Sequence, residues 1–407
     1  MPHKLHEANL EGLRGLAAFM IVFCHIFTYK QELDPNLIIS AIGNYTADGH
    51  FSVLIFFCLS GYVIGISNKQ QLKTRADVLA YLKKRFIRLY PIYLVSILSI
   101  VCFINSQQIG LLIKHLFFGQ VLLGPVFYEN NPLWSLNYEV IFYLLFIPLS
   151  LFELSPKKVL LTALTIAFIN TVLHSYYHTP SLLSSYLLGF VFWLSGLILS
   201  QYSSKKNSTP LSANFVVSTF CLILASKYII NLPPKLAGLF NFPETVPWIS
   251  RAIPLSDMLI LPFCVAYILL LTNINFRYRK AVIIILYAFP LLIFANAFLK
   301  HNWAVVAIPV TFYCASLLLL NPNFLKNTTA ALVKLMIYLG SISYAVYAMH
   351  FPILSYFHSI TFFSGSIFTF NIRMIIFFII LIGVCVFLEK YMQPKAKKYL
   401  NKLLTKT

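Results

Sequence analysis

An arginine and a histidine, Arg14 and His25, lie eleven residues apart in the first apolar segment of the chain. Eleven residues at about 100° each return to nearly the same face of a helix, and a rise of about 1.5 Å per residue separates them by roughly 16 Å in depth. Ionisable side chains are costly in hydrocarbon, so inside a membrane they indicate a functional site. Two other interpretations stay open, because Arg14 could anchor one end of the helix and His25 could bond a neighbouring carbonyl.

A second basic cluster, residues 83–88, contains two arginines that are three residues apart. Arg85 and Arg88 therefore share one face of a helix. Arg88 is followed directly by the apolar run that begins at Leu89, so we place it within a membrane segment rather than in a loop. Guanidinium groups at this place could hold a phosphorylated ligand from the cytosol through paired hydrogen bonds. The alternative is ordinary anchoring of a span at its cytoplasmic end.

Polar residues also open the fourth apolar segment, which begins with Trp134 and Ser135 and contains Glu139. The amphipathic ring of Trp134 suits a membrane interface. Glu139 lies about one turn deeper, so we expect its carboxylate to face a partner inside the protein rather than lipid. A structural ion pair would explain Glu139 equally simply.

A polar stripe marks a further apolar segment near the C-terminus. Ser343, Tyr347 and His350 fall at positions i, i+4 and i+7, which is one face of a helix. Small residues such as Ser343 often serve only to let helices approach closely. His174 and His178 have a spacing that metal sites can use, but no acidic or cysteine ligand is near them, so we expect no metal.

The composition assigns the chain to the membrane proteins. Of its 407 residues, 59% are hydrophobic and 11% are charged, with a mean hydropathy of +0.79. Soluble domains carry about a quarter charged residues. The net charge of +19 could suggest nucleic-acid binding, but the basic residues lie between apolar runs, as expected beside membrane lipids on the cytoplasmic side. We therefore predict an all-α, polytopic bundle with no nucleic-acid partner; the sequence does not indicate an oligomeric state.

Windows of about 19 apolar residues predict the individual spans. Twelve candidates run roughly over 10–29, 49–67, 86–104, 134–152, 159–174, 182–200, 212–230, 257–275, 281–299, 303–320, 335–357 and 370–389. The candidates at 159–174 and 303–320 are short, so ten spans are the alternative. The amphipathic stretch 111–124 is predicted to lie in the membrane interface.

The distribution of positive charge predicts the orientation. With the N-terminus in the cytoplasm, 24 of the 31 lysines and arginines fall on the cytoplasmic side, which places the C-terminus there too. The loops at 30–48 and 231–256 then face outwards, and the second is proline-rich enough to form a short lid. Residues 1–392 are predicted to form the membrane domain, and 393–407 a basic amphipathic tail on the anionic inner leaflet.

Five motifs in the same order resemble those of the acyltransferase-3 family of integral membrane acyltransferases, and the resemblance extends over about residues 10–390. The motifs are Leu10 to Gly15 with His25, Phe56 to Tyr62, Arg85 to Arg88 with Tyr90 and Pro91, Trp134 to Glu139, and Ile342 to His350. The chain departs from the family at Leu54, where members often have an acidic residue, so a role for that carboxylate is not expected here.

The resemblance implies a function and a location. Members of the family transfer acyl groups, usually acetyl, from a cytoplasmic donor such as acetyl-CoA to hydroxyls of carbohydrates, commonly bacterial surface or secreted glycans. We therefore expect a multi-pass protein of the bacterial cytoplasmic membrane. It would bind acyl-CoA as a co-substrate, accept a carbohydrate, and hold no permanent cofactor and no metal. A transporter or flippase of a glycan or lipid-linked sugar is the alternative, because inner arginines and buried charges also fit that class.

The expected roles follow from depth in the membrane. Arg14, Arg85 and Arg88 would hold the phosphates of the donor near the cytoplasm. Catalysis would fall to three deeper residues: His25 as general base, Glu139 as an orienting or ion-pairing group, and His350 as oxyanion stabiliser or proton shuttle. Supporting contacts are expected from Glu11, Trp134, Ser135, Ser343 and Tyr347. Direct transfer and a covalent acyl-enzyme intermediate both stay open.

Overall fold

The computed structural model describes residues 2–37, 48–176, 181–203, 211–226, 253–272, 274, 276–299 and 303–404. Within these ranges the regular structure is helical and contains no strand, which confirms the all-α prediction. The helices are α1 (Pro2–Thr28), α2 (Lys30–Leu33), α3 (Gly49–Ser67), α4 (Arg75–Leu98), α5 (Ile109–Leu116), α6 (Trp134–Leu151), α7 (Pro156–Tyr176), α8 (Leu182–Ser203), α9 (Ala213–Ala225), α12 (Leu261–Thr272), α13 (Arg279–Leu299), α14 (Trp303–Leu318), α15 (Lys326–Gly340), α16 (Ser343–Ser359), α17 (Ile367–Val386) and α18 (Gln393–Leu404).

Nine helices of the described ranges are long and apolar enough to cross a membrane, and α15 with α16 would make a tenth as one bent span. The chain is thus a multi-pass membrane protein. The predicted spans 212–230 and 303–320 correspond to α9, with 13 residues, and α14, with 16. A helix of 13 residues is roughly 20 Å long, which is shorter than a hydrocarbon core of about 30 Å. The expectation of twelve full-length spans is therefore not met in the described ranges.

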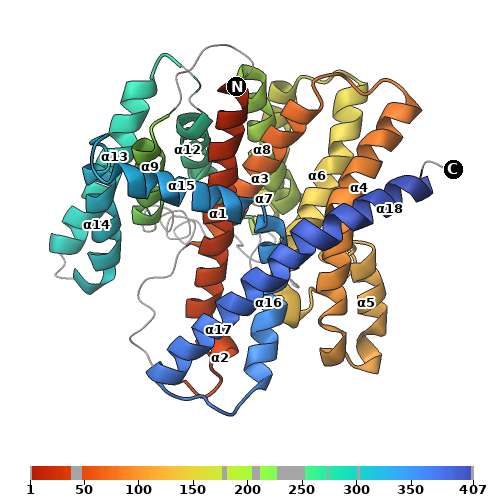
Figure 1. Ribbon diagram of the computed structural model, residues 1–407. Helices are drawn as coiled ribbons and strands as arrows, with labels where there is room; N and C mark the ends of the chain where they lie inside the picture. The colour runs from red at the N-terminus through yellow and green to blue at the C-terminus, as the bar shows by residue number, and fades with distance from the viewer. Residues whose placement is uncertain are drawn as a thin grey trace.

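The segment predicted as one straight span over 335–357 is broken. Helices α15 and α16 are bent by 71° relative to each other. Figure 1 shows α15 lying across α1, while α16 runs beside the lower half of α1. Because hydropathy windows report only how apolar a segment is, a change of direction inside such a segment escapes them.

Two glycines allow the crossing of α1 and α15. A Cβ atom at Gly340 would lie 1.9 Å from the backbone oxygen of Glu11, and one at Gly15 would lie 2.4 Å from that of Met336. Both distances are far below van der Waals contact, so the two helices touch backbone to backbone. This contact places the Glu11–Arg14 turn of α1 beside the break between α15 and α16.

Replacing Gly340 with alanine is expected to lower the thermal stability of the purified protein, because overpacking a tight contact typically costs about 1–3 kcal/mol. Gly383 of α17 is the matched control, since a Cβ atom there would meet no atom within 4 Å. Gly383→Ala should leave stability unchanged or raise it. Thermal unfolding of both variants in detergent tests the contact, and equal melting temperatures would contradict it.

The C-terminal part of the chain forms one long helical arm. Helix α17 continues through a π-helical turn, Phe387–Met392, directly into α18, and the run Ile367–Lys402 spans 36 residues. The helix therefore continues across the boundary predicted at 392/393. Gln393 donates from Nε2 to the backbone oxygens of Ile87 at 2.7 Å and Arg88 at 3.1 Å, which attaches the start of α18 to α4. The predicted tail is thus held against the bundle at its first turn.

The stretch predicted to lie in the interface, 111–124, contains most of the eight-residue helix α5, which ends at Leu116. His115, to which the sequence assigned no role, is fully buried here and bonds the backbone oxygen of Leu111 from Nδ1 at 2.9 Å. Burial lowers the pKa of His115 to about 4. Its imidazole is therefore neutral near pH 7 and fills a structural position between α4 and the turn that precedes α6.

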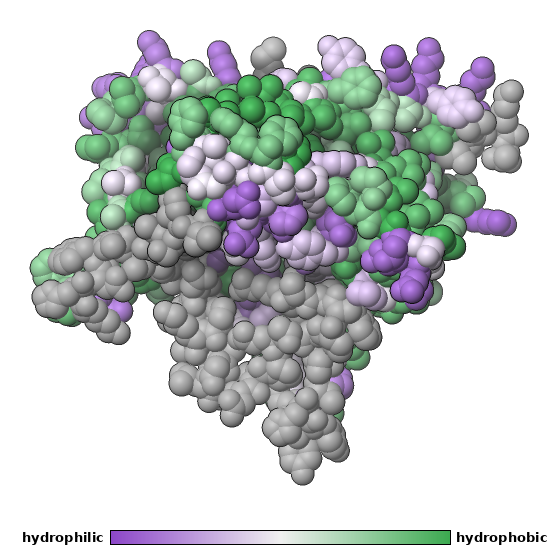
Figure 2. Space-filling view, turned by 90° about the horizontal axis from the view of Figure 1, so that it is seen from below, coloured by the Kyte–Doolittle hydropathy of each residue, from purple (hydrophilic) through white to green (hydrophobic). Residues whose placement is uncertain are grey.

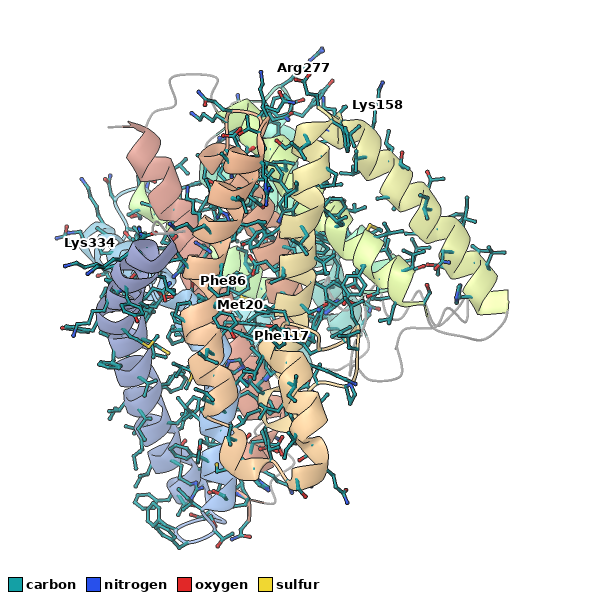
Figure 3. All side chains as sticks on the ribbon, turned by 90° about the vertical axis from the view of Figure 1, so that its right-hand side faces the viewer. Met20, Phe86, Phe117, Lys158, Arg277 and Lys334 are labelled. Atoms are coloured by element: carbon teal, nitrogen blue, oxygen red, sulfur yellow. The ribbon has the colours of Figure 1, made fainter. Side chains whose placement is uncertain are left out.

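Two of the loops predicted to be cytoplasmic lie at the same end of the molecule. Figure 3 places Lys158 and Arg277, from two loops predicted to be cytoplasmic, together at the upper end, where Figure 1 shows the N-terminus. Figure 2 shows the opposite face, where polar residues gather between apolar surroundings in its described part. Much of the predicted outer loop 231–256 lies outside the described residues.

Cysteine labelling tests which end is cytoplasmic. In a variant without the seven native cysteines, Phe362→Cys should react with a membrane-impermeant thiol reagent on intact cells, and Lys73→Cys should react only after lysis. Both positions are exposed in the structure, Phe362 at 77%, so access does not differ for reasons of burial. Labelling of position 73 alone would invert the orientation.

Candidate active site

A cavity of about 820 Å³ lies between α1, α3, α4, α6, α16 and the C-terminal arm. Basic side chains dominate its charged lining: Arg14, Lys83, Lys84, Arg85, Arg88, Lys390 and Lys397, against the carboxylates of Glu11, Glu139 and Glu389. The three arginines that sequence reasoning assigned to the donor thus line one space, although they come from α1 and α4. An anion entering this space would meet a net positive charge.

Two of the arginines are paired with acidic residues. Arg88 Nη1 lies 2.7 Å from Glu389 Oε2, whose side chain is only 4% exposed, and the guanidinium also lies 5.4 Å from the ring of Tyr344. Arg14 Nη1 lies 3.4 Å from Glu11 Oε2 within the same helix. These contacts fix the arginine side chains in the cavity wall while leaving further guanidinium N–H groups to bond a ligand.

Arg85 is held by a different kind of contact. Its Nη2 donates to Ser67 Oγ at 3.1 Å, and its guanidinium carbon lies 5.5 Å from the ring of Tyr81 and 5.7 Å from that of Tyr143. Cation–π contacts of this kind are worth about 0.5–1 kcal/mol at exposed sites and more when desolvated. Figure 3 shows Phe86, the neighbour of Arg85, at about mid-height of the molecule. Helix α4 begins at Arg75, well before the predicted start at 86, so Arg85 lies inside a regular helix.

Glu139 is bonded by hydroxyl groups. Ser60 Oγ donates to Glu139 Oε1 at 2.7 Å, and Tyr143 donates to the same oxygen at 2.5 Å. Glu139 lines the cavity together with both of these partners. Sequence reasoning missed Ser60 and Tyr143. The sequence contained features from which both could have been predicted. Ser60 lies in the motif from Phe56 to Tyr62, and Tyr143 follows Glu139 by four residues, which is about one helical turn.

The polar stripe of α16 forms the deep end of the cavity. Ser343 and Tyr347 line it, and both are nearly fully buried. The Tyr347 hydroxyl donates to the backbone oxygen of Pro132 and therefore accepts from Ser135 Oγ, which is 2.5 Å away. Ser135 also lines the cavity. Trp134, whose ring suits a membrane interface, is 7% exposed and packs edge-on against Tyr138 at 5.3 Å, inside the bundle.

The two histidines predicted for catalysis meet each other. The rings of His25 and His350 have centroids 5.1 Å apart. His350 is fully buried, and its Nδ1 contacts the backbone oxygens of Val346 at 3.1 Å and Tyr347 at 2.8 Å. Since carbonyls only accept, Nδ1 carries the proton in the neutral ring, and Nε2 is left as an acceptor.

Buried nitrogens of this pair face no protein partner. Among the described residues, His25 Nδ1 and His350 Nε2 are buried without a hydrogen-bond partner. Aromatic rings surround them: Phe351 lies 5.2 Å and Tyr29 5.7 Å from His25 between centroids. Buried polar atoms are rarely left unpaired in a folded protein, and a catalytic role or a bound water or ion is among the explanations for such an exception.

The three residues predicted for catalysis therefore fall into two groups. Glu139 lies in the cavity with the arginines, whereas His25 and His350 form a pair about one helical turn beyond Tyr347, whose ring centroid is 6.1 Å from that of His350. The bonds that Glu139 makes are with hydroxyls rather than with either imidazole. Tyr347 links the two groups, because it lines the cavity and its backbone oxygen accepts a hydrogen bond from His350.

Another histidine pairs with an acid outside this site. His50 Nε2 lies 2.5 Å from Asp257 Oδ2, and both side chains are nearly fully buried. This pair joins the start of α3 to the turn before α12 and lines no part of the cavity. His174, considered above for metal binding, bonds the backbone oxygen of Asn170 from Nδ1 at 2.9 Å, while His178 lies outside the described residues.

Comparison with known proteins identifies the family of the chain. The sequence profile of the acyltransferase domain, acyltransferase family 3, matches residues 7–390. The chain is similar to acyltransferase MdmB of Streptomyces mycarofaciens, with 29% identity over 157 residues, which are 36% of this chain and 39% of that protein. It is also similar to the candidate acetyltransferase ORF330 of Acidianus two-tailed virus, with 27% identity over 236 residues, 56% of this chain and 67% of that protein.

The match covers less than half the length of MdmB, and no solved structure matches the chain. The family profile, by contrast, covers nearly all of the sequence, including both helices of the histidine pair and every helix that contributes to the cavity except α18, which begins after residue 390. The chain therefore belongs to the acyltransferase-3 family and is a multi-pass membrane protein.

Proposed function

We propose that the protein transfers an acyl group, in the first instance acetyl, from acyl-CoA on the cytoplasmic side to a hydroxyl of a carbohydrate on the other side of the membrane. The observation that carries this proposal is the juxtaposition of two features: a cavity lined by Arg14, Arg85 and Arg88, and the pair of His25 and His350 about one turn beyond its deep end. The cytoplasmic location of the basic end, and the bacterial cell membrane as its setting, are part of the proposal.

Several features support a CoA donor. The cavity has a volume of about 820 Å³, within the usual range for small-molecule sites, and its charged lining is mostly basic. CoA carries its phosphates at one end and its thioester at the end of a long, flexible arm. With the phosphates at the arginines, the arm would run along Ser60 and Glu139 towards Ser135 and Tyr347.

The histidine pair would perform the proton transfer. His25 removes the proton from the acceptor hydroxyl as the oxygen attacks the thioester carbonyl; the C–S bond then breaks, and the CoA thiolate leaves. Because the thiolate is a good leaving group, a strong general acid is not needed. His350 Nε2 is an acceptor in the neutral ring, which favours a role in passing the proton from His25 over a role as oxyanion donor.

A transporter or flippase remains the rival function, and one observation bears on it. The break between α15 and α16 resembles the discontinuous helices that line transport sites. The bent segment contributes Ser341, Ser343 and Tyr347 to a cavity that also contains the predicted donor arginines. We therefore assign the break to acyl-donor binding, in keeping with the family.

The proposal is tested with purified protein in lipid nanodiscs and acetyl-CoA. Wild-type protein should release CoA, and release should accelerate when a soluble carbohydrate acceptor is added. The His25→Ala variant should do neither. Failure of wild-type protein to bind or turn over any acyl-CoA would contradict the proposed donor.

A further inference from the structure

The C-terminal arm forms one wall of the cavity. Besides Glu389, five residues of this arm line the cavity: Lys390, Gln393, Pro394, Lys397 and Asn401. Their spacing of three, four, seven and eleven residues from the first one defines a single face of a helix. Lys395 and Lys398 lie on the same helix but are not part of the lining. The predicted basic tail is thus two-sided, with one basic face turned to the cavity.

The C-terminal arm is attached to α4, the helix that contains Arg85 and Arg88. The ion pair between Arg88 and Glu389 joins α4 to the arm, and Gln393 bonds the backbone oxygens of Ile87 and Arg88. A π-helical turn over Phe387–Met392 separates α17 from α18, and such turns are frequent at functional sites. The face that contains Lys397 therefore holds a defined position relative to Arg88.

The cavity lining has more basic side chains than its acidic side chains can neutralise. Glu389 and Glu11 are engaged by Arg88 and Arg14, and among the described residues no salt bridge involves Lys83 or Lys397. Lys397 is exposed, and it lies two turns further along the arm than Lys390, so it lies towards the open end of the cavity. A multiply charged anion would find matching, unneutralised cations there.

We propose that α18 is part of the donor-binding site and that Lys397, with Lys83 of α4, binds the phosphate group at the nucleotide end of the donor. This inference rests on the proposed function. A CoA molecule whose thioester points to Ser135 and Tyr347 leaves its ribose 3′-phosphate at the opposite end of the cavity, which is the end that these lysines line. Lys397 would thus distinguish CoA from donors that lack this phosphate.

The test compares binding of CoA with that of 3′-dephospho-CoA. In nanodiscs of zwitterionic lipid, Lys397→Ala should raise the Kd for CoA about tenfold, less than a fully buried charged hydrogen bond would give, because the side chain is exposed. The Kd for 3′-dephospho-CoA should change little. Lys397→Arg keeps the charge and should restore most of the affinity. Lys395→Ala and Lys398→Ala are matched controls, which remove a lysine from the same helix outside the cavity.

The outcomes separate this inference from the proposed function. If wild-type protein binds CoA but Lys397→Ala binds it equally well, the role of α18 is wrong while the CoA donor stands. If all three lysine variants lose affinity alike, and only in nanodiscs with anionic lipid, the tail contacts the membrane surface and the inference is wrong. If wild-type protein fails to bind CoA at all, both proposals fall.

Discussion

Replacing His25 with alanine is expected to abolish acyl transfer, with a loss of at least about 10²- to 10⁴-fold, the usual contribution of a positioned general base. The expected loss is large because the imidazole of His350 does not replace that of His25 as the base. The proton of neutral His350 is on Nδ1, which is bonded to the backbone of its own helix, so this ring is fixed in one orientation. The measurement is the rate of CoA release from acetyl-CoA in the presence of a carbohydrate acceptor.

The variant should still fold and insert. His25 makes ring contacts with Phe351 and Tyr29, but its buried Nδ1 has no hydrogen-bond partner among the described residues, so alanine leaves no polar group newly unpaired. His358→Ala serves as a control, since His358 is exposed and its ring nitrogen Nδ1 contacts the backbone oxygen of Gln31. Near-normal transfer by His25→Ala, or loss of activity that merely follows loss of protein, would contradict the role of general base.

Removing the guanidinium of Arg88 is expected to weaken CoA binding by roughly 10- to 100-fold, because a charge-assisted hydrogen bond typically contributes about 1.5–3 kcal/mol. Arg14→Ala and Arg85→Ala should have effects in the same direction. The Arg88 variant is harder to interpret than the other two, because the side chain of its partner Glu389 is only 4% exposed. A buried carboxylate without its partner destabilises the fold by itself, which would confuse loss of binding with loss of structure.

A pair of variants separates the two effects. Arg88→Gln with Glu389→Gln removes both charges and keeps groups that can bond each other, so the protein should retain its melting temperature. CoA titration of this double variant should still show the weakened affinity. Lys158→Ala is the control for a basic residue outside the cavity, and Figure 3 shows Lys158 at the upper end of the molecule. Unchanged affinity in the double variant and in the Arg14 and Arg85 variants would reduce these residues to membrane anchors.

Hydropathy and residue spacing within single segments were enough to predict the class of fold and many of the residues that line the cavity. Hydropathy windows located the membrane helices because each reports on one segment only, and the residue spacing placed Arg85 with Arg88 and Ser343 with Tyr347 on common faces. Both pairs line the cavity, as a shared face requires. The same logic missed the bend between α15 and α16, because an apolar segment stays apolar when it changes direction.

The assignment of Glu139 shows a second limit. Depth along the helices placed Glu139 near both histidines, but depth does not say which direction a side chain takes around the bundle. In the structure Ser60 and Tyr143 hold Glu139 within the cavity, while His25 packs against His350. The roles of these residues in catalysis stay predictions, which the His25 variant tests first.

The sequence by itself determined that this chain is a helical membrane protein of the acyltransferase-3 family and which faces of its helices are polar. These properties depend on residues within one or two turns of each other, where spacing dictates geometry. Only the tertiary structure decided which faces meet. Arg88 and Glu389 are 301 residues apart in sequence, and the arm that contains Glu389 and Lys397 became a wall of the cavity because α18 packs on α4. Such pairings depend on the packing of whole helices, which no local spacing encodes.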